Sequence, residues 1–124
     1  MKTENGEMLF EKTECGVPYK IHTQTIEREA KDWQDVLDHV SEMFDDADEF
    51  VTLTLGEARH NIRYVQAARK MRGDQIIVQL GIEDDKYTRL VEKLCGEEEC
   101  VEIFWEFYSS SNVSDLDKYK PVKF

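Results

Sequence analysis

The apolar residues of this chain change their spacing along the sequence, and that change limits the folds open to it. Between residues 33 and 44 they recur every three to four positions, as in an amphipathic helix. Between residues 50 and 82 they alternate with polar residues or form β-branched runs, as in strands. A one-sided helix and one-sided strands must bury their apolar surfaces against each other, so the pattern predicts helices packed on a sheet.

The helical segment has an apolar side and an acidic side. The apolar side consists of Trp33, Val36, Leu37, Val40, Met43 and Phe44. The other side carries Asp32, Asp35, Asp38, Glu42, Asp45 and Asp46. We therefore expect a helix that buries its apolar stripe and leaves a row of carboxylates at the surface.

Strand patterns occur both before and after this helix. Residues 8–13 and 17–24 flank a turn at Cys15-Gly16, which is typical of a hairpin. After the helix, residues 50–55, 62–71 and 75–82 follow one another with short turn signals between them, which predicts a meander. Residues 86–94 fit either a strand or a helix, and we favour a fourth strand of the meander.

Glutamates at positions 97 to 99 favour the start of a second helix, because acids are stabilising in a first helical turn. Its apolar stripe would be Val101, Phe104, Trp105 and Tyr108. Residues 109–124 are expected to form an extended C-terminal segment. The whole order predicts an α+β fold, with a mainly antiparallel sheet and one or two helices packed on one face.

The length of 124 residues suits a single domain that spans residues 1–124. The first ten residues hold no apolar stretch of signal-peptide length, and no run is long enough to span a membrane. Three cysteines without a secretory signal are most simply free thiols. We therefore expect a cytoplasmic protein that does not contact membranes.

The chain lacks the sequence patterns of common catalytic and cofactor sites. It contains no glycine-rich phosphate loop, no zinc-type cysteine spacing and no calcium-loop pattern. The histidines, His22, His39 and His60, occur in no nucleophile signature, and His39 borders the apolar stripe as a structural histidine would. We expect no enzyme activity, no catalytic residues, no metal and no cofactor.

Charge is distributed unevenly over a chain whose net charge is −11. Residues 27–49 hold ten acidic and two basic residues, and residues 83–102 hold eight acidic and three basic ones. Residues 58–73 contain no acid but five bases: Arg59, Arg63, Arg69, Lys70 and Arg72. Either this basic segment neutralises the neighbouring acids through surface ion pairs, or the acidic helix remains free to meet a positively charged partner. Direct nucleic-acid binding is disfavoured by the surrounding negative charge.

Part of the chain resembles a known class of proteins. The segments FVTLTL, NIRYVQAA and IIVQLGIE, with an acidic turn before VEIFWEFY, resemble the small acidic immunity proteins of bacterial polymorphic toxin systems. The resemblance covers residues 50–108, about half of the chain. It implies a protein that binds and blocks one cognate toxin, often a nuclease.

The sequence thus favours a stoichiometric inhibitor that docks an acidic surface on a basic protein partner. The candidate contact residues are Asp35, Asp38, Glu42, Asp45 and Asp46. Two alternatives remain open. One is an anti-CRISPR or anti-restriction inhibitor of phage or mobile-element origin that acts as a DNA mimic. The other is a small enzyme or ligand-binding domain, which a pocket holding Gln66, Gln79 and a histidine would favour.

Overall fold

The computed structural model describes residues 19–45, 50–56, 60–69, 75–83 and 88–122. Two short strands, β2 (Tyr19–His22) and β3 (Glu27–Glu29), precede helix α1 (Trp33–Phe44). Four strands follow: β4 (Phe50–Leu55), β5 (Ile62–Arg69), β6 (Ile76–Glu83) and β7 (Thr88–Cys95). The chain then forms helix α2 (Glu97–Ser110), the 3₁₀ turn η1 (Leu116–Lys118) and strand β8 (Lys120–Pro121).

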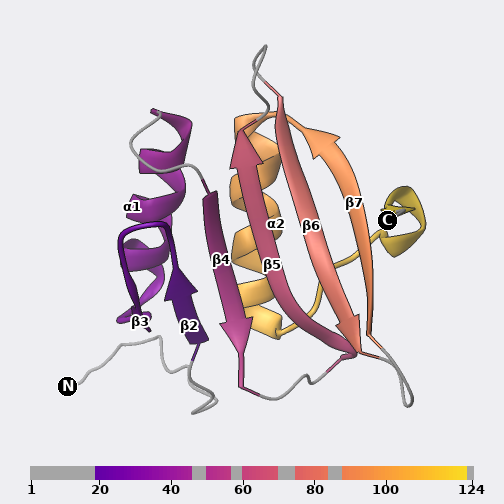
Figure 1. The fold of residues 1–124 in the computed structure, drawn as a ribbon, viewed down its shortest axis with the longest axis horizontal. Helices are drawn as coiled ribbons and strands as arrows, with labels where there is room; N and C mark the ends of the chain where they lie inside the picture. The colour runs from indigo at the N-terminus through magenta and orange to yellow at the C-terminus, as the bar shows by residue number, and fades with distance from the viewer. Residues whose placement is uncertain (1–18, 46–49, 57–59, 70–74, 84–87, 123–124) are drawn as a thin grey trace, which may run out of the picture.

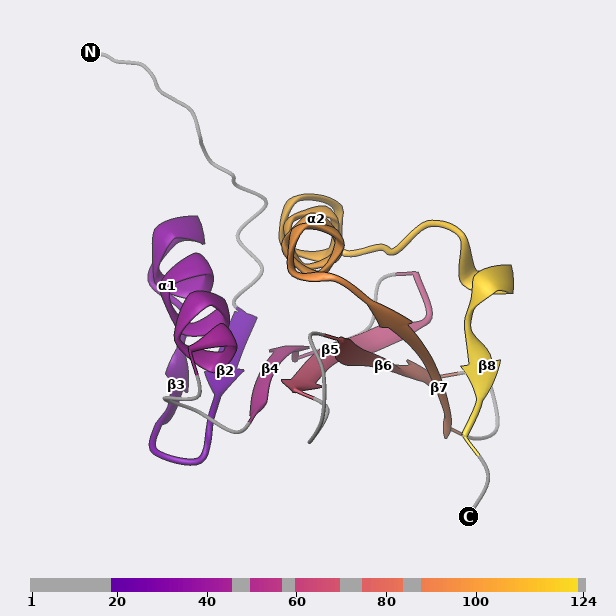
Figure 2. The same ribbon diagram turned by 90° about the horizontal axis from the view of Figure 1, so that it is seen from above.

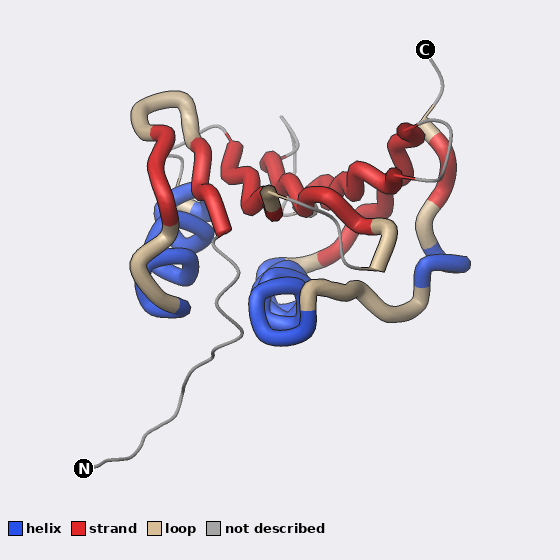
Figure 3. Tube along the Cα trace, turned by 90° about the horizontal axis from the view of Figure 1, so that it is seen from below, coloured by secondary structure: helices blue, strands red, loops and turns tan. Residues whose placement is uncertain are grey.

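The strands form one antiparallel sheet of seven strands in the order β3-β2-β4-β5-β6-β7-β8 (Figure 1). Strands β4 to β7 are neighbours in sequence and in space, as a meander requires. Both helices lie on the same side of the sheet, with α1 toward the β2–β4 end and α2 toward its middle (Figures 2 and 3). This arrangement confirms the predicted α+β fold with a mainly antiparallel sheet.

The core lies between the helices and the covered face of the sheet. Alternate residues of β4, namely Val51, Leu53 and Leu55, are fully buried. Helix α1 contributes Val36, Val40 and Met43, and α2 contributes Phe104 and Phe107. Burying each of these side chains stabilises the fold by roughly 1.5–3 kcal/mol relative to leaving it exposed, so the core determines which face of each helix points inward.

Local contacts fix where α1 begins and where α2 ends. The Asp32 carboxylate caps α1 by accepting the Asp35 backbone N–H at 2.8 Å. At the end of α2, Ser111 adopts a left-handed conformation and its backbone N–H bonds to the Phe107 carbonyl at 2.7 Å. The Tyr19 hydroxyl of β2 donates to the same carbonyl at 2.9 Å. This bond ties the first described strand to the end of the second helix.

The structure agrees with some of the sequence expectations and differs from others. Residues 88–95 form a strand, as favoured for the segment 86–94. The second helix is present, but its buried face consists of Cys100, Ile103, Phe104 and Phe107. Within 109–124, α2 continues to Ser110, and the chain returns through η1 to the sheet edge at β8. The first strand of the predicted hairpin, residues 8–13, lies outside the described residues.

Candidate functional site

The outward side of α1 carries three exposed carboxylates. Asp38, Glu42 and Asp45 lie at successive intervals of four and three residues, so they follow one another along one face of the helix. The opposite face is buried, and α1 packs on β4, β5 and α2. The predicted acidic row is therefore a surface feature for these three residues. Asp46, the fifth predicted contact residue, lies outside the described residues.

Asp35 has different surroundings from the other carboxylates of the row. Its two oxygens accept hydrogen bonds from both terminal nitrogens of Arg28, at 2.6 and 2.9 Å, and from the Lys31 backbone N–H at 2.9 Å. The side chain is only 11% exposed. The hydrogen bonds from the Arg28 guanidinium lower the pKa of Asp35 to about 2. The charge of Asp35 is thus compensated within the chain and adds little to an external negative face.

The other three carboxylates have no cationic partner within the described part of the chain. Asp38 accepts a hydrogen bond from the Gln34 side-chain amide at 2.8 Å, which is a neutral donor. Among the described residues, none forms an ion pair with Asp38, Glu42 or Asp45. The outward face of α1 formed by these three residues, termed the acidic face below, is therefore a coherent negative surface.

This acidic face works against the stability of its own helix. Glu42 and Asp45 lie at the C-terminal end of α1, where the helix dipole disfavours negative charge, and the last turn contains no basic residue. Asp38 and Glu42 are also four residues apart, a spacing at which like charges repel. Each effect amounts to about 0.2–1 kcal/mol. Helix stability therefore does not explain why acids occupy these positions.

The basic segment 58–73 does not cover the acidic face within the part of the chain that the structure describes. Arg63 pairs with Glu83 at 2.8 Å and donates to the Leu55 carbonyl at 2.6 Å. Arg69 donates to the backbone carbonyl of Phe44 at 2.5 Å. The remaining bases of the segment, Arg59, Lys70 and Arg72, lie outside the described residues. The two described arginines thus bind other groups than the three exposed carboxylates.

A second feature of the helical layer was not predicted from the sequence. Trp105 of α2 is 47% exposed, and its ring meets that of Trp33 edge-on with centroids 5.1 Å apart. Trp33 also contacts Tyr108, at 5.8 Å between ring centroids. The sequence period predicts Trp105 on the buried side of α2. The residues that are buried are Cys100, Ile103, Phe104 and Phe107, so the buried side is turned by about one residue from the predicted one. An exposed indole between two helices is a common anchor in protein interfaces.

The uncovered face of the sheet carries a row of polar side chains across four strands. Thr52 donates to the Gln66 side-chain oxygen at 2.8 Å, and the Gln79 amide donates to Glu92 at 3.0 Å. The amide of Gln66 lies 3.5 Å from the Gln79 oxygen. His22 occupies the same row, as the register partner of Thr52, but it is exposed. Gln66 and Gln79 thus bond within the row, and the pocket described below is lined by other residues.

His39, Cys95 and Cys100 lie in buried or partly buried surroundings. His39 is 15% exposed, and its Nδ1 lies 2.9 Å from the Asp35 carbonyl oxygen. Cys95 and Cys100 are both buried free thiols. Across the described ranges, no group of three or more His, Cys, Asp or Glu side chains could hold a metal ion.

Comparisons with models of protein families, with curated proteins and with solved structures found no significant match to this chain. Neither described helix has the length and apolar character needed to cross a bilayer.

Proposed function

We propose that this chain is a stoichiometric inhibitor that binds a basic protein through the acidic face of α1. The observation that carries the proposal is the state of Asp38, Glu42 and Asp45, which are exposed and have no ionic partner among the described residues. Carboxylates arranged in this way attract a cationic surface over a distance and fix its orientation on contact.

The energetics of α1 support a binding role for the acidic face. Glu42 and Asp45 destabilise the C-terminal turn of the free helix, because the helix dipole disfavours negative charge there. A cationic partner would remove this penalty on binding, because its charges would lie close to both the carboxylates and the negative end of the helix dipole. Residues that weaken the free protein in this way are typical of functional surfaces.

The partner class that we favour is a toxin that acts on nucleic acid. A nuclease must carry a positively charged surface to hold its substrate, and a row of carboxylates can occupy that surface in place of phosphates. Such a partner also agrees with the resemblance to immunity proteins. An inhibitor of a CRISPR or restriction enzyme would use the same docking chemistry, and the identity of the bound protein distinguishes the two.

The proposal can be tested by affinity capture from the organism that encodes the chain, at low salt. The test variant is Asp38→Lys/Glu42→Lys. The matched control is Glu29→Lys/Asp117→Lys, which changes the net charge equally at two other exposed positions. We expect the wild type and the control to retain the same basic protein, and the test variant to lose it.

Retention of that protein by the test variant would contradict the proposal. The captured protein is then assayed alone and with increasing amounts of the chain. Inhibition that is complete at a ratio of about one to one would support the inhibitor class, whereas full activity at saturation would contradict it.

A further inference from the structure

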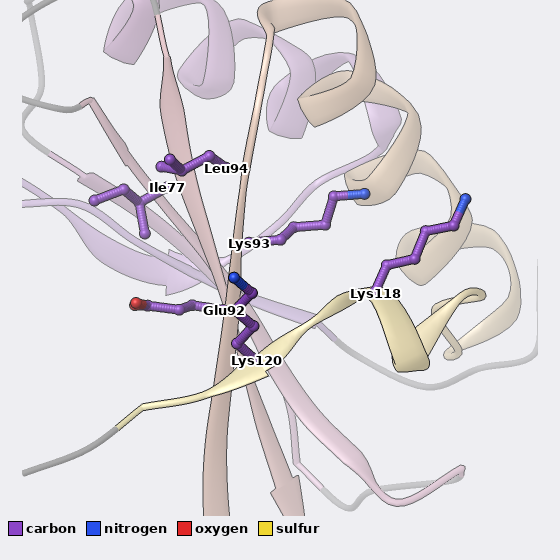
Figure 4. A pocket seen from close by; sticks show the side chains of 6 residues that line it. All are labelled: Ile77, Glu92, Lys93, Leu94, Lys118 and Lys120. Carbon is purple, nitrogen blue, oxygen red and sulfur yellow. The ribbon is translucent and has the colours of Figure 1, made fainter.

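A pocket of about 690 Å³ lies at the β7–β8 edge of the sheet (Figure 4). It is lined by Ile77, Glu92, Lys93, Leu94, Lys118 and Lys120. These residues come from β6, β7, η1 and β8, so the C-terminal segment builds one wall and the sheet builds the other. The volume falls within the range of small-molecule sites in proteins.

The pocket exists because β8 covers only part of β7. The pairing between these strands is restricted to Val91 with Pro121 and Glu92 with Lys120, beside the bond from the Val122 N–H to the Leu90 carbonyl. In an antiparallel strand, every second residue directs its N–H and C=O to the same edge. Leu90 and Glu92 face β8, so the backbone of Leu94 faces the same edge, beyond Lys120, the first residue of β8. No described residue pairs with Leu94 there.

The floor of the pocket is apolar. Ile77 and Leu94 are register partners on β6 and β7, so their side chains lie next to each other on the uncovered face. The Leu94 side chain is 44% exposed. Among the described residues, it is one of three large apolar side chains that are classed as exposed. An apolar group placed on these two side chains would gain favourable burial.

The wall of the pocket is basic, in a chain that is otherwise strongly acidic. Lys118 and Lys120 are both exposed, while Tyr119 between them is buried, so the two lysines start from the outward side of the segment. Lys118 has a weak surface contact with Asp115, at 3.8 Å. Lys120 forms no ion pair with another described residue.

The two other charged lining residues are already engaged. Glu92 accepts a hydrogen bond from Gln79 and points away from the Lys120 ammonium group (Figure 4). Lys93 pairs with Glu99, and its ammonium lies 5.4 Å from the centre of the Tyr119 ring. Lys118 and Lys120 thus supply the available positive charge of the pocket.

We propose that this pocket binds a small organic anion, in which a carboxylate or phosphate group is attached to an apolar body. The apolar body lies on Ile77 and Leu94. The anionic group accepts hydrogen bonds from the flexible side chains of Lys118 and Lys120 and from the Leu94 backbone N–H. This site is separate from the acidic face, so either proposal can fail without the other.

The test uses three probes that share one apolar chain: octanoate, octyl phosphate and 1-octanol. Each is titrated into the ¹⁵N-labelled full-length protein, and amide shifts are followed by NMR. We expect both anions to shift the Leu94 amide in a saturable manner, with the neutral alcohol binding about tenfold more weakly because it lacks the charge-assisted hydrogen bonds. The stronger of the two anions indicates whether the natural ligand carries a carboxylate or a phosphate.

The variant Lys118→Gln/Lys120→Gln should lower the affinity for the anions about tenfold and leave the affinity for octanol unchanged. The control Lys20→Gln/Lys31→Gln removes the same charge at exposed positions outside the pocket and should bind all three probes as the wild type does. Thermal unfolding verifies that both variants are folded. Equal affinity for octanol and the anions, shifts centred elsewhere, or undiminished binding by the first variant would each overturn the proposal.

Discussion

Arg28 and Asp35 show that carboxylates on one helix can have different roles. Both terminal nitrogens of Arg28 bond to the Asp35 carboxylate, which joins β3 to the first turn of α1. Asp38, one turn further along the helix, is exposed and bonds only to a neutral amide among the described groups. The first carboxylate supports the fold, and the second is available to a partner.

This difference predicts the effect of neutralising each side chain. Asp35→Asn should lower the free energy of unfolding at pH 7 by about 1 kcal/mol, a value reduced by the partial solvent exposure of Arg28. Asp38→Asn is the matched control and should change stability by less than about 0.5 kcal/mol. Urea unfolding at pH 7 measures both values, and an equal loss in the two variants would contradict the assignment.

The same pair predicts a dependence of stability on pH. The pKa of Asp35 is about 2 in the folded chain and 3.8 in its ordinary state, so the unfolded chain binds this proton first as the pH falls. The contribution of the pair is therefore complete above pH 3.8 and is lost as the pH falls through about 2. The difference in stability between wild type and Asp35→Asn should shrink over this interval and vanish only below pH 2, and a difference that does not shrink between pH 4 and pH 2 would argue against the pair.

Gly81 offers another prediction for a single residue. A Cβ atom at this position would lie 2.1 Å from the Tyr64 ring, because Tyr64 of β5 covers its cross-strand partner Gly81 of β6. Gly81→Ala should displace the ring and lower the free energy of unfolding by about 1–2 kcal/mol. The loss should be smaller in a Tyr64→Ala background, which a double-mutant cycle measures. Equal losses in both backgrounds would show that the ring is not the cause.

Among the elements, α1 shows a conflict between stability and the proposed function. Glu42→Lys/Asp45→Lys places positive charge at the C-terminal end of the helix, where the dipole favours it. We expect an increase of about 0.5–1 kcal/mol in the free energy of unfolding, together with weaker binding of the captured partner. Glu29→Lys/Asp117→Lys, at two exposed positions outside α1, is the control for net charge. Lower stability in the double variant would contradict our account of these two positions.

The sequence predicted α1 accurately because the apolar side of the helix faces the core and the acidic side is exposed. It was less informative for β3 and β8. The sequence of β3, Glu27–Glu29, has no strand pattern, and its pairing depends on a turn in which the Thr23 hydroxyl accepts the Ile26 backbone N–H at 3.3 Å. Strand β8 has only two residues and pairs through contacts distant in sequence. Tertiary contacts of this kind leave no local periodicity.

The candidate sites were predictable to different extents for related reasons. The exposed positions of Asp38, Glu42 and Asp45 follow from the helical period. The pairing of Asp35 depends on Arg28 in β3, a strand that the sequence pattern did not indicate. The pocket at Leu94 depends on where β8 begins, so no spacing of residues could have predicted it.

On the scale of the whole molecule, the acidic face and the pocket lie toward different ends of the sheet. The acidic face of α1 lies near the β2–β4 end, and the basic wall formed by Lys118 and Lys120 lies at the β7–β8 edge (Figure 2). The net charge of −11 adds a long-range attraction toward cationic partners that salt screens. Local contacts at α1 and the total charge are therefore separate contributions to binding.

The most direct measurement is the dissociation constant of the captured partner over a range of salt concentrations. It separates the contribution of the acidic face from that of the total charge. For Asp38→Lys/Glu42→Lys, we expect affinity to fall at least about tenfold more than for Glu29→Lys/Asp117→Lys, with a smaller dependence on salt. Equal losses of affinity in the two variants would show that total charge, and not the acidic face of α1, determines binding.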